Sequence, residues 1–392
     1  MSFKITFTPL NYTGWGALDH LLDEVKRFDA KNILIVTDSL LEKLGIVDQV
    51  VNPLEAVGIQ TEIYTEVVPE PPLEVAEKLV RHTREREFDL VIGLGGGSAL
   101  DLAKLAGVLA THDGDVADYL NLTGKRSLTH KGLPKILIPT TSGTGSEVTN
   151  IAVLSLETSK DVVTHDYLLP DAAIVDPALT VSLPPKVTAA TGIDALTHAV
   201  EAYISVNANP VTDGLALQAI RLISGSIRTA VSDGSNKEAR SDMSYGSYLA
   251  GLAFFNAGVA GVHALAYPLG GQFHIAHGES NAVLLPYVMG YIRSSCEKRM
   301  QDIYEAMGYT LSAQHDEGDS LKCIEELKRM VADVGIPLSL QGFGITEAAL
   351  GNLTEDALKQ QRILARSPMQ LEREDIHAIY RNAFEGVVRE KS

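Results

Sequence analysis

Three histidines lie close together in one glycine-rich, largely apolar stretch of the sequence. His263, His274 and His277 fall within GVHALAYPLGGQFHIAHGESN, residues 261–281, which contains no lysine or arginine. On one straight helix His263 and His277 would point the same way, but they would lie about 21 Å apart, too far to share a ligand. Pro268 and a Gly-Gly pair stand between them, and such residues favour a break in the helix that lets the chain turn back. The question is whether another segment joins the two histidines.

A second motif supplies a carboxylate. The segment TGIDALTHAVEAY places Asp194 and His198 four residues apart on an expected helix, so both side chains project from one face. Taken alone, the pair also fits a helix surface, or a capping aspartate beside a core histidine. Together with His263 and His277 it makes one carboxylate and three imidazoles, a ligand set that suits ferrous iron or zinc. His274 remains as a substrate-pocket residue, a residue behind the ligands, or a polar core residue.

Two glycine-rich loops follow expected strands. In FDLVIGLGGGSALDLAK an apolar strand leads into three glycines and a helix that carries Ser98 near its start, an arrangement that lets backbone N–H groups approach a diphosphate. The spacing is not G-x-G-x-x-G, so a turn without any ligand is the alternative. The second loop, IPTTSGTGSEVTN, offers hydroxyl groups beside glycines. Its short hydroxyl donors are Thr140, Thr141, Ser142 and Thr144. Two such loops on one sheet favour nucleotide binding.

One acid at a strand end could select the cofactor. Asp38 ends ILIVTD, long before the glycines, whereas the ribose-binding acid of an ordinary Rossmann motif follows them by about twenty residues. From a neighbouring strand the Asp38 carboxylate could still bind an adenosine ribose and repel a 2′-phosphate, which would favour NAD over NADP. The alternative is a helix-capping aspartate before SLLEKLG.

Composition and charge restrict the class of protein. A chain of 392 residues with 45 % hydrophobic residues is long enough for two domains. The formal net charge of −17 argues against nucleic acid and anionic membranes as partners and leaves a small molecule. The two cysteines, Cys296 and Cys323, exclude a thiolate zinc knuckle and fit a reducing compartment. There is no signal-peptide pattern and no run of about twenty apolar residues, so we expect a cytoplasmic location.

The pattern of expected elements changes along the chain. Before about residue 180, β-branched runs alternate with helical segments such as LLEKLGIVDQVVNPLEAVG (40–58), which is typical of a parallel sheet covered on both faces. The expected strands are NILIVTD (32–38), QTEIY (60–64), FDLVIGL (88–94), PKILIPT (134–140) and DAAIVD (171–176). After Pro184-Pro185, long helical patterns dominate. We predict an α/β nucleotide-binding domain over residues 1–183 and an all-α metal-binding domain over residues 184–392.

These motifs together resemble one known family. Over about residues 5 to 385 the chain looks like the iron-containing (group III) alcohol dehydrogenases, through GGGSALDLAK, PTTSGTGSEVT, AATGIDALTHAVEAY, GLAFFNAGVAGVHALAYPLGG and HGESNAVLLPYV. The resemblance implies a dehydroquinate synthase-like architecture with a nucleotide-binding α/β domain and a helical domain. It also implies a cleft that holds NAD(P) and a divalent metal, and dimers or larger assemblies.

The resemblance also carries over site residues position by position. The implied metal ligands are Asp194, His198, His263 and His277. The implied cofactor-binding residues are Asp38, Gly96, Gly97, Ser98, Thr140, Thr141 and Thr144, with Lys160 and Leu179 near the ribose. Two positions depart from the family pattern. Many members have histidine where Tyr267 stands, and asparagine in P-N-P-T where this chain reads PEPP with Glu70.

The expected reaction is hydride transfer between NAD(H) and a small alcohol or aldehyde, with the metal as Lewis acid. The resemblance favours Fe2+, and Zn2+ could substitute. The expected catalytic residues are His277, His274 and Tyr267. Phenols ordinarily titrate at about pH 10 and imidazoles at about pH 6.5. We therefore expect His274, or water leading from the ribose, to carry the proton, while Tyr267 shapes the pocket.

Three alternatives are kept. The first is a glycerol-dehydrogenase-like zinc enzyme, and the second is a dehydroquinate-synthase-like lyase. The lyase would need cationic groups for its anionic substrate, and residues 251–281 supply none. The third is a nucleotide-binding or assembly protein without catalytic activity.

Overall fold

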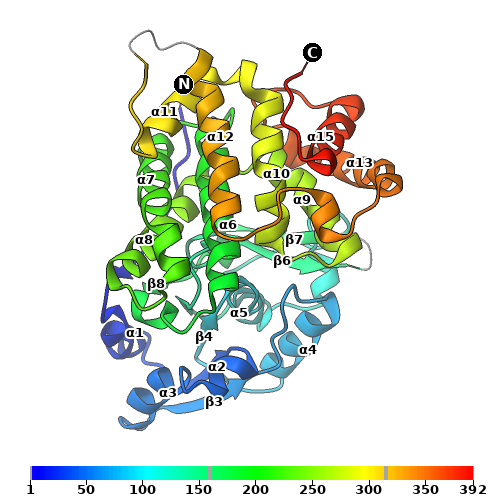
Figure 1. The fold of residues 1–392 in the computed structure, drawn as a ribbon. Helices are drawn as coiled ribbons and strands as arrows, with labels where there is room; N and C mark the ends of the chain where they lie inside the picture. Colours follow the sequence, from blue (N-terminus) through cyan, green and yellow to red (C-terminus); the bar gives the residue numbers. More distant parts are fainter. Residues whose placement is uncertain (1, 157–159, 313–316, 392) are drawn as a thin grey trace. The chain divides into compact units, whose positions relative to one another are not determined.

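The chain folds into two compact units. The computed structural model describes residues 2–156, 160–312 and 317–391. Thr6–Ser182 make an α/β unit, and the residues from Leu183 onward, together with those up to Ile5, make a helical unit. Figure 1 shows the elements of both units, coloured along the sequence.

A six-stranded, wholly parallel sheet forms the centre of the α/β unit. Successive side chains point to opposite faces, so Ile33 and Ile35 belong to one hydrophobic core while Leu34 and Val36 belong to another. All five predicted strands are present. In spatial order the strands are β1 (Asn11–Thr13), β8 (Ala172–Val175), β5 (Lys135–Pro139), β4 (Leu90–Gly95), β2 (Asn32–Val36) and β3 (Gln60–Tyr64).

Helices cover both faces of this sheet. One face carries α4 and α5, and the other carries α1, α2 and α3. The segment 40–58, expected as one helical stretch, is two helices, because Gly45 adopts φ 70° and ends the first of them. The main helices are α1 (Leu21–Arg27), α2 (Ser39–Lys43), α3 (Asp48–Glu55), α4 (Leu73–Arg84) and α5 (Gly97–Leu109).

Two short features of the α/β unit have no counterpart in the sequence analysis. Strand β1 is three residues long, too short to give a periodic signal. Strands β6 (Ile151–Ser155) and β7 (Lys160–Thr164) form a separate antiparallel pair after the second glycine-rich loop. The fold class, a parallel-sheet α/β unit followed by an all-α unit, is confirmed for the described residues.

The helical unit packs around one large hydrophobic core. Helix α6 lies against α7, α8 and α10, and α9 lies against α10. Short α14 spans Gln361–Leu364. The longer helices are α6 (Pro185–Ile204), α7 (Pro210–Ser232), α8 (Lys237–Ala257), α9 (Gly261–Phe273), α10 (His277–Ile292), α11 (Glu297–Ala306), α12 (Glu317–Asp333), α13 (Leu350–Leu358) and α15 (Arg373–Glu385).

The predicted break between His263 and His277 falls later than expected. Helix α9 continues through Pro268 and the following glycines to Phe273, and its C-cap, His274, adopts the left-handed conformation with φ 54°. Pro268, Leu269 and Gly270 are buried, so tertiary packing outweighs the cost of a proline in a helix. The chain then turns and begins α10 at His277.

No single helix among the described residues is long and apolar enough to cross a membrane. Only α8 and α9 taken together pass that test by length and composition, and they are bent by 105° at their junction.

Candidate functional site

Helix α6 presents the carboxylate and one histidine of the predicted ligand set. Its first residue, Pro185, suits a helix start because that position has no intrahelical partner for an N–H group. Asp194 and His198 lie one turn apart in its middle, and both are buried, at 2 % and 5 % exposure. Such burial of a carboxylate requires partners that favour its charge.

The other two histidines stand at the beginnings of two successive helices. His263 is in the first turn of α9, and His277 is the first residue of α10. The turn at residues 274–276 therefore brings together two side chains that are fourteen positions apart in the sequence. Because α9 and α10 pack against each other and both contact α6, the three helices hold their histidines over one point.

The four side chains converge as predicted. One ligand atom from each of Asp194, His198, His263 and His277 lies within 4.8 Å of all the others. Asp194 Oδ1 is 3.9 Å from His263 Nε2 and 3.7 Å from His277 Nε2. Burial by itself raises the pKa of Asp194, but the three imidazoles and a hydrogen bond outweigh it and hold that pKa below its ordinary value. Metal–ligand bonds of about 2 Å fit this spacing.

Asn281 lies where acceptor atoms from three of these four side chains converge. Its amide nitrogen lies 2.7 Å from Asp194 Oδ1, 3.1 Å from His263 Nε2 and 3.2 Å from His277 Nε2. An amide has only two N–H groups, so it cannot donate to all three of these acceptors at once. The Asn281 Oδ1 atom is also buried with no hydrogen-bond partner among the described residues. A divalent cation would satisfy all the converging acceptors, so the residues fit a metal ion.

The group is open on one side. The side chain of His277 is 27 % exposed, whereas those of Asp194 and His263 are each 2 % exposed. The ring of Phe254 stacks on His198 with centroids 4.3 Å apart, and the ring of Tyr267 lies 6.0 Å from that of His277. Two aromatic side chains therefore border the group, and the side of His277 is the one a small molecule could approach.

His274 lies outside this group. It is exposed and caps the end of α9, so the alternative of a polar core residue is wrong. The group of potential metal ligands found among the described residues does not include it.

The two glycine-rich loops lie against each other in the α/β unit. Strands β4 and β5 are neighbours in the sheet, and the Thr140 N–H donates to Gly95 O at 2.9 Å. A Cβ atom on Gly97 would stand 2.7 Å from Thr144 Cγ2, so only glycine permits this approach. The N-cap of α5, Gly96, has no side-chain cap. The first N–H groups of α5 lie next to Thr144. Helix-terminal N–H groups beside hydroxyl groups are typical of a phosphate site.

A buried lysine fixes the second loop to α5. Lys104 is 0 % exposed, and its ammonium group donates to Ser146 Oγ at 2.7 Å, to Thr149 Oγ1 at 3.0 Å and to Ile151 O at 2.8 Å. Burial lowers the pKa of Lys104, although neighbouring Asp101 opposes this effect. These hydrogen bonds hold the residues that follow Thr144 in a fixed position against α5.

Asp38 has a local structural role. Its Oδ1 accepts hydrogen bonds from the N–H groups of Leu40 at 2.9 Å and Leu41 at 3.0 Å, which caps α2. The capping alternative is therefore confirmed. The other oxygen, Oδ2, lies 3.9 Å from the position a Cβ would take on Gly95. The carboxylate thus faces the first glycine-rich loop as well.

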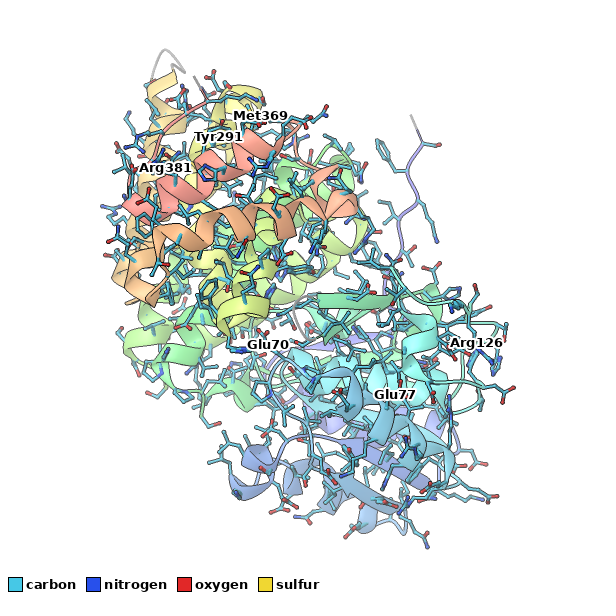
Figure 2. The ribbon with its side chains drawn as sticks, turned by 90° about the vertical axis from the view of Figure 1, so that its right-hand side faces the viewer. Glu70, Glu77, Arg126, Tyr291, Met369 and Arg381 are labelled. Carbon is cyan, nitrogen blue, oxygen red and sulfur yellow. The ribbon has the colours of Figure 1, made fainter. Side chains whose placement is uncertain are left out.

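The departure at PEPP creates an ion pair. Glu70, labelled in Figure 2, adopts φ 49°, a left-handed conformation that asparagine accommodates more easily. Its carboxylate lies 2.7 Å from Lys160 Nζ, and its N–H donates to Ser98 Oγ at 3.1 Å. Lys160 and Ser98 are thereby both linked to residue 70. Leu179 differs from them, because its side chain is 3 % exposed and belongs to the core of the unit.

The sequence did not lead us to two further residues that lie beside the four candidate metal ligands. Glu201 lies seven residues after Asp194 and Asn281 lies four residues after His277. Both spacings place a side chain on the same helix face as a ligand. The helical spacing of these two residues could therefore have been noticed in the sequence. Spacing on one helix, however, does not show which side chains of other helices they contact.

A parallel-sheet unit with two adjoining loops of this kind, and a buried group of three histidines and one aspartate, are typical of metal-dependent dehydrogenases. Comparisons with known proteins agree with this class. The family model described as iron-containing alcohol dehydrogenase matches residues 9–177, and the one described as the C-terminal part of the Fe-containing alcohol dehydrogenase family matches residues 188–384. The chain belongs to the iron-containing alcohol dehydrogenase family and is an oxidoreductase that acts on alcohols or aldehydes.

Similar proteins match over nearly the whole chain. Long-chain-alcohol dehydrogenase 1 of Geobacillus thermodenitrificans is 70 % identical over 387 residues, which cover 99 % of this chain and 98 % of that protein. The 1,3-propanediol dehydrogenase of Klebsiella pneumoniae is 40 % identical and covers 96 % of this chain and 97 % of its own. A crystal structure of 1,3-propanediol oxidoreductase has a TM-score of 0.94 at 39 % identity, covering 98 % of this chain and 100 % of that one.

Proposed function

We propose that this protein interconverts unbranched alcohols and aldehydes with NAD(H) and Fe2+ as cofactors. The observation that carries the proposal is the convergence of the four ligand atoms within 4.8 Å. A divalent ion held by Asp194, His198, His263 and His277 would supply Lewis acidity toward an alcohol or carbonyl oxygen. The donor set suits iron and zinc alike, and the family description supports iron.

The roles of the protein groups follow from their places. Asp194 is the one carboxylate in the group, so it partly neutralises a dication. Phe254 and Tyr267 would restrict water and orient the alkyl part of the substrate, since their rings lie beside His198 and His277. The two loops at Gly97 and Thr144 would hold the diphosphate of the dinucleotide.

The activities after which two similar proteins are named support an unbranched substrate. One similar protein is named for long-chain alcohols, and another for 1,3-propanediol. We infer that the alkyl chain lies against apolar side chains and that the terminal hydroxyl reacts.

An activity panel tests this proposal. The protein would be stripped of metal, reconstituted anaerobically with Fe2+ or Zn2+, and assayed with NAD and NADP against ethanol, butanol, octanol, hexadecanol, 1,3-propanediol and glycerol. We expect the highest kcat/KM with Fe2+, NAD and an unbranched primary alcohol. The highest value with Zn2+ and glycerol would instead support a polyol dehydrogenase, and no turnover in any combination would reject the proposal.

We expect the Asp38→Asn variant to use NADP better than the parent. Asparagine is an equally good helix cap, so α2 keeps the hydrogen bonds that Asp38 now accepts. The loss of one negative charge removes a repulsion of about 1–2 kcal/mol with a 2′-phosphate, which corresponds to roughly tenfold in the NADP/NAD ratio of kcat/KM. Asp38→Gly, which also loses the cap, serves as comparison. An unchanged ratio in both variants would remove Asp38 from the ribose pocket.

We expect Tyr267→Phe to keep kcat within about threefold and to raise KM for the alcohol, because the ring contact with His277 persists while the hydroxyl is lost. His274→Ala should lower kcat by about tenfold or more if the exposed imidazole carries the proton to solvent. Steady-state kinetics across pH would compare both. A hundredfold loss in Tyr267→Phe together with an unchanged His274→Ala would exchange the two roles.

The homo-oligomeric state and the cytoplasmic location expected from the sequence stay predictions. The mass in solution, measured by light scattering, would test the first of them. No nucleic acid or membrane partner is proposed.

A further inference from the structure

Helix α6 carries a third titratable residue on the face that holds Asp194 and His198. Glu201 follows them at the next turn and is completely buried, at 0 % exposure. Positions 194, 198 and 201 are spaced by four and three residues, so they form one stripe along the helix. A completely buried carboxylate is costly unless each of its oxygens accepts hydrogen bonds.

Both oxygens of Glu201 accept hydrogen bonds from the beginning of α9. Oε1 accepts from the Val262 N–H at 2.5 Å, and Oε2 accepts from the Ala260 N–H at 3.0 Å. The His263 N–H also points to Oε2, at 3.4 Å. The N-cap of α9 has no side-chain cap of its own, so Glu201 supplies the acceptor that the first turn of this helix lacks.

Glu201 also contacts the imidazole of His263 directly. His263 Nδ1 lies 2.6 Å from Glu201 Oε2. A carboxylate can only accept a hydrogen bond, so Nδ1 carries the hydrogen. The lone pair of the neutral ring is then on Nε2, the atom that lies 3.9 Å from Asp194 Oδ1 and 3.1 Å from the Asn281 amide. The ring is thus oriented with its acceptor nitrogen toward the ligand group.

We propose that Glu201 is a positioning residue for metal binding: it selects the tautomer of His263 and brings a second buried negative charge close to the ion. The inference rests on the proposed function, because it assigns a role around the same metal. Glu201 is not one of the four side chains whose ligand atoms converge. Partners of this kind behind a ligating histidine raise metal affinity by about 10–100-fold.

A purely structural role is the competing explanation. If Glu201 only caps α9, its replacement should destabilise the fold and leave the metal affinity of the folded protein unchanged. The two explanations therefore differ in metal affinity, not in stability.

The Glu201→Gln variant separates them. Glutamine keeps the size of the side chain and one acceptor oxygen, but it lacks the charge and cannot accept at both positions. The dissociation constant would be measured with Co2+ by competition with a chromophoric chelator, together with the visible spectrum of bound Co2+. We expect binding to weaken by about 10–100-fold and the spectrum to change.

Ser205→Ala is the matched control. Ser205 follows on the same chain segment, is 4 % exposed, and donates to Ala257 O at 2.7 Å near the start of α9 without contact to a ligand. It should lower thermal stability as a lost buried hydrogen bond does, with the Co2+ dissociation constant unchanged. Equal affinities of Glu201→Gln and the parent would overturn the inference.

Two further results keep the tests separate. A parent protein that binds no Co2+, Zn2+ or Fe2+ would reject the proposed function itself. If Glu201→Gln does not fold, the parent still answers the question through 1H–15N NMR of the metal-free protein labelled in histidine. A hydrogen on Nδ1 of His263 is the expected result, and a hydrogen on Nε2 would overturn the inference.

Discussion

The His263→Ala variant is expected to retain no metal after gel filtration and to lose alcohol turnover by about a thousandfold or more. The side chain is 2 % exposed and is one of the four whose ligand atoms converge, so its removal takes away one of the four donors. Lewis-acid stabilisation is worth several kcal/mol, and about 4 kcal/mol corresponds to a thousandfold in rate. Metal content by elemental analysis and steady-state kinetics would measure both effects.

NAD binding by the same variant should change little. The two glycine-rich loops belong to the α/β unit, whereas His263 belongs to the helical unit. Fluorescence titration with NADH would test this. His377→Ala, on α15 of the helical unit and outside the ligand group, is the matched control and should behave as the parent does. Full activity of His263→Ala in the presence of a strong chelator would show that the metal role is wrong.

The Gly278→Ala variant should be destabilised by about 3 kcal/mol and should bind metal poorly. A Cβ atom at this position would stand 2.2 Å from Ala190 O and 2.7 Å from Ala190 C. These are backbone atoms of α6, which cannot rotate away, so α10 must shift relative to α6. Gly278 directly follows His277, and the shift would therefore move a ligand away from Asp194. Urea unfolding and metal titration would measure the two effects.

Gly225→Ala is the control for this prediction. Gly225 lies within α7, and a Cβ there would meet no atom within 4 Å. Removing a glycine from a helix with free space should be neutral or stabilise by about 0.5–1 kcal/mol. If Gly278→Ala were as stable as Gly225→Ala, the close packing of α6 and α10 at residue 190 would be wrong.

The sequence was sufficient for the features that depend on local patterns. Five strands, the change from α/β to all-α architecture and the main helices follow from hydrophobic periodicity. The four candidate ligands could be named because carboxylate and imidazole are chemically distinctive, and because Asp194 and His198 share a helix face. The three-residue β1 was not predicted because so short a segment gives little periodic signal. The β6–β7 pair was not predicted either.

Tertiary structure decided the features that depend on how elements pack. Pro268 would end an isolated helix, but burial in the core keeps α9 continuous as far as His274. Asp38 admitted two roles, and the structure shows that it caps α2 while its second oxygen faces Gly95. The extent of α9 and the role of Asp38 depend on contacts between residues that are distant in the sequence, so a local sequence pattern cannot predict them.

The same distinction holds at the metal-type centre. Residue types and spacing determined which four side chains could bind a metal, because ligand chemistry is a property of the side chains themselves. Only the packing of α6, α9 and α10 decided that Asn281 lies among these ligands and that Glu201 lies behind His263. Hydrogen bonds require contact within about 3 Å, and for residues 62 positions apart in sequence, as Glu201 and His263 are, that distance is set by the fold alone.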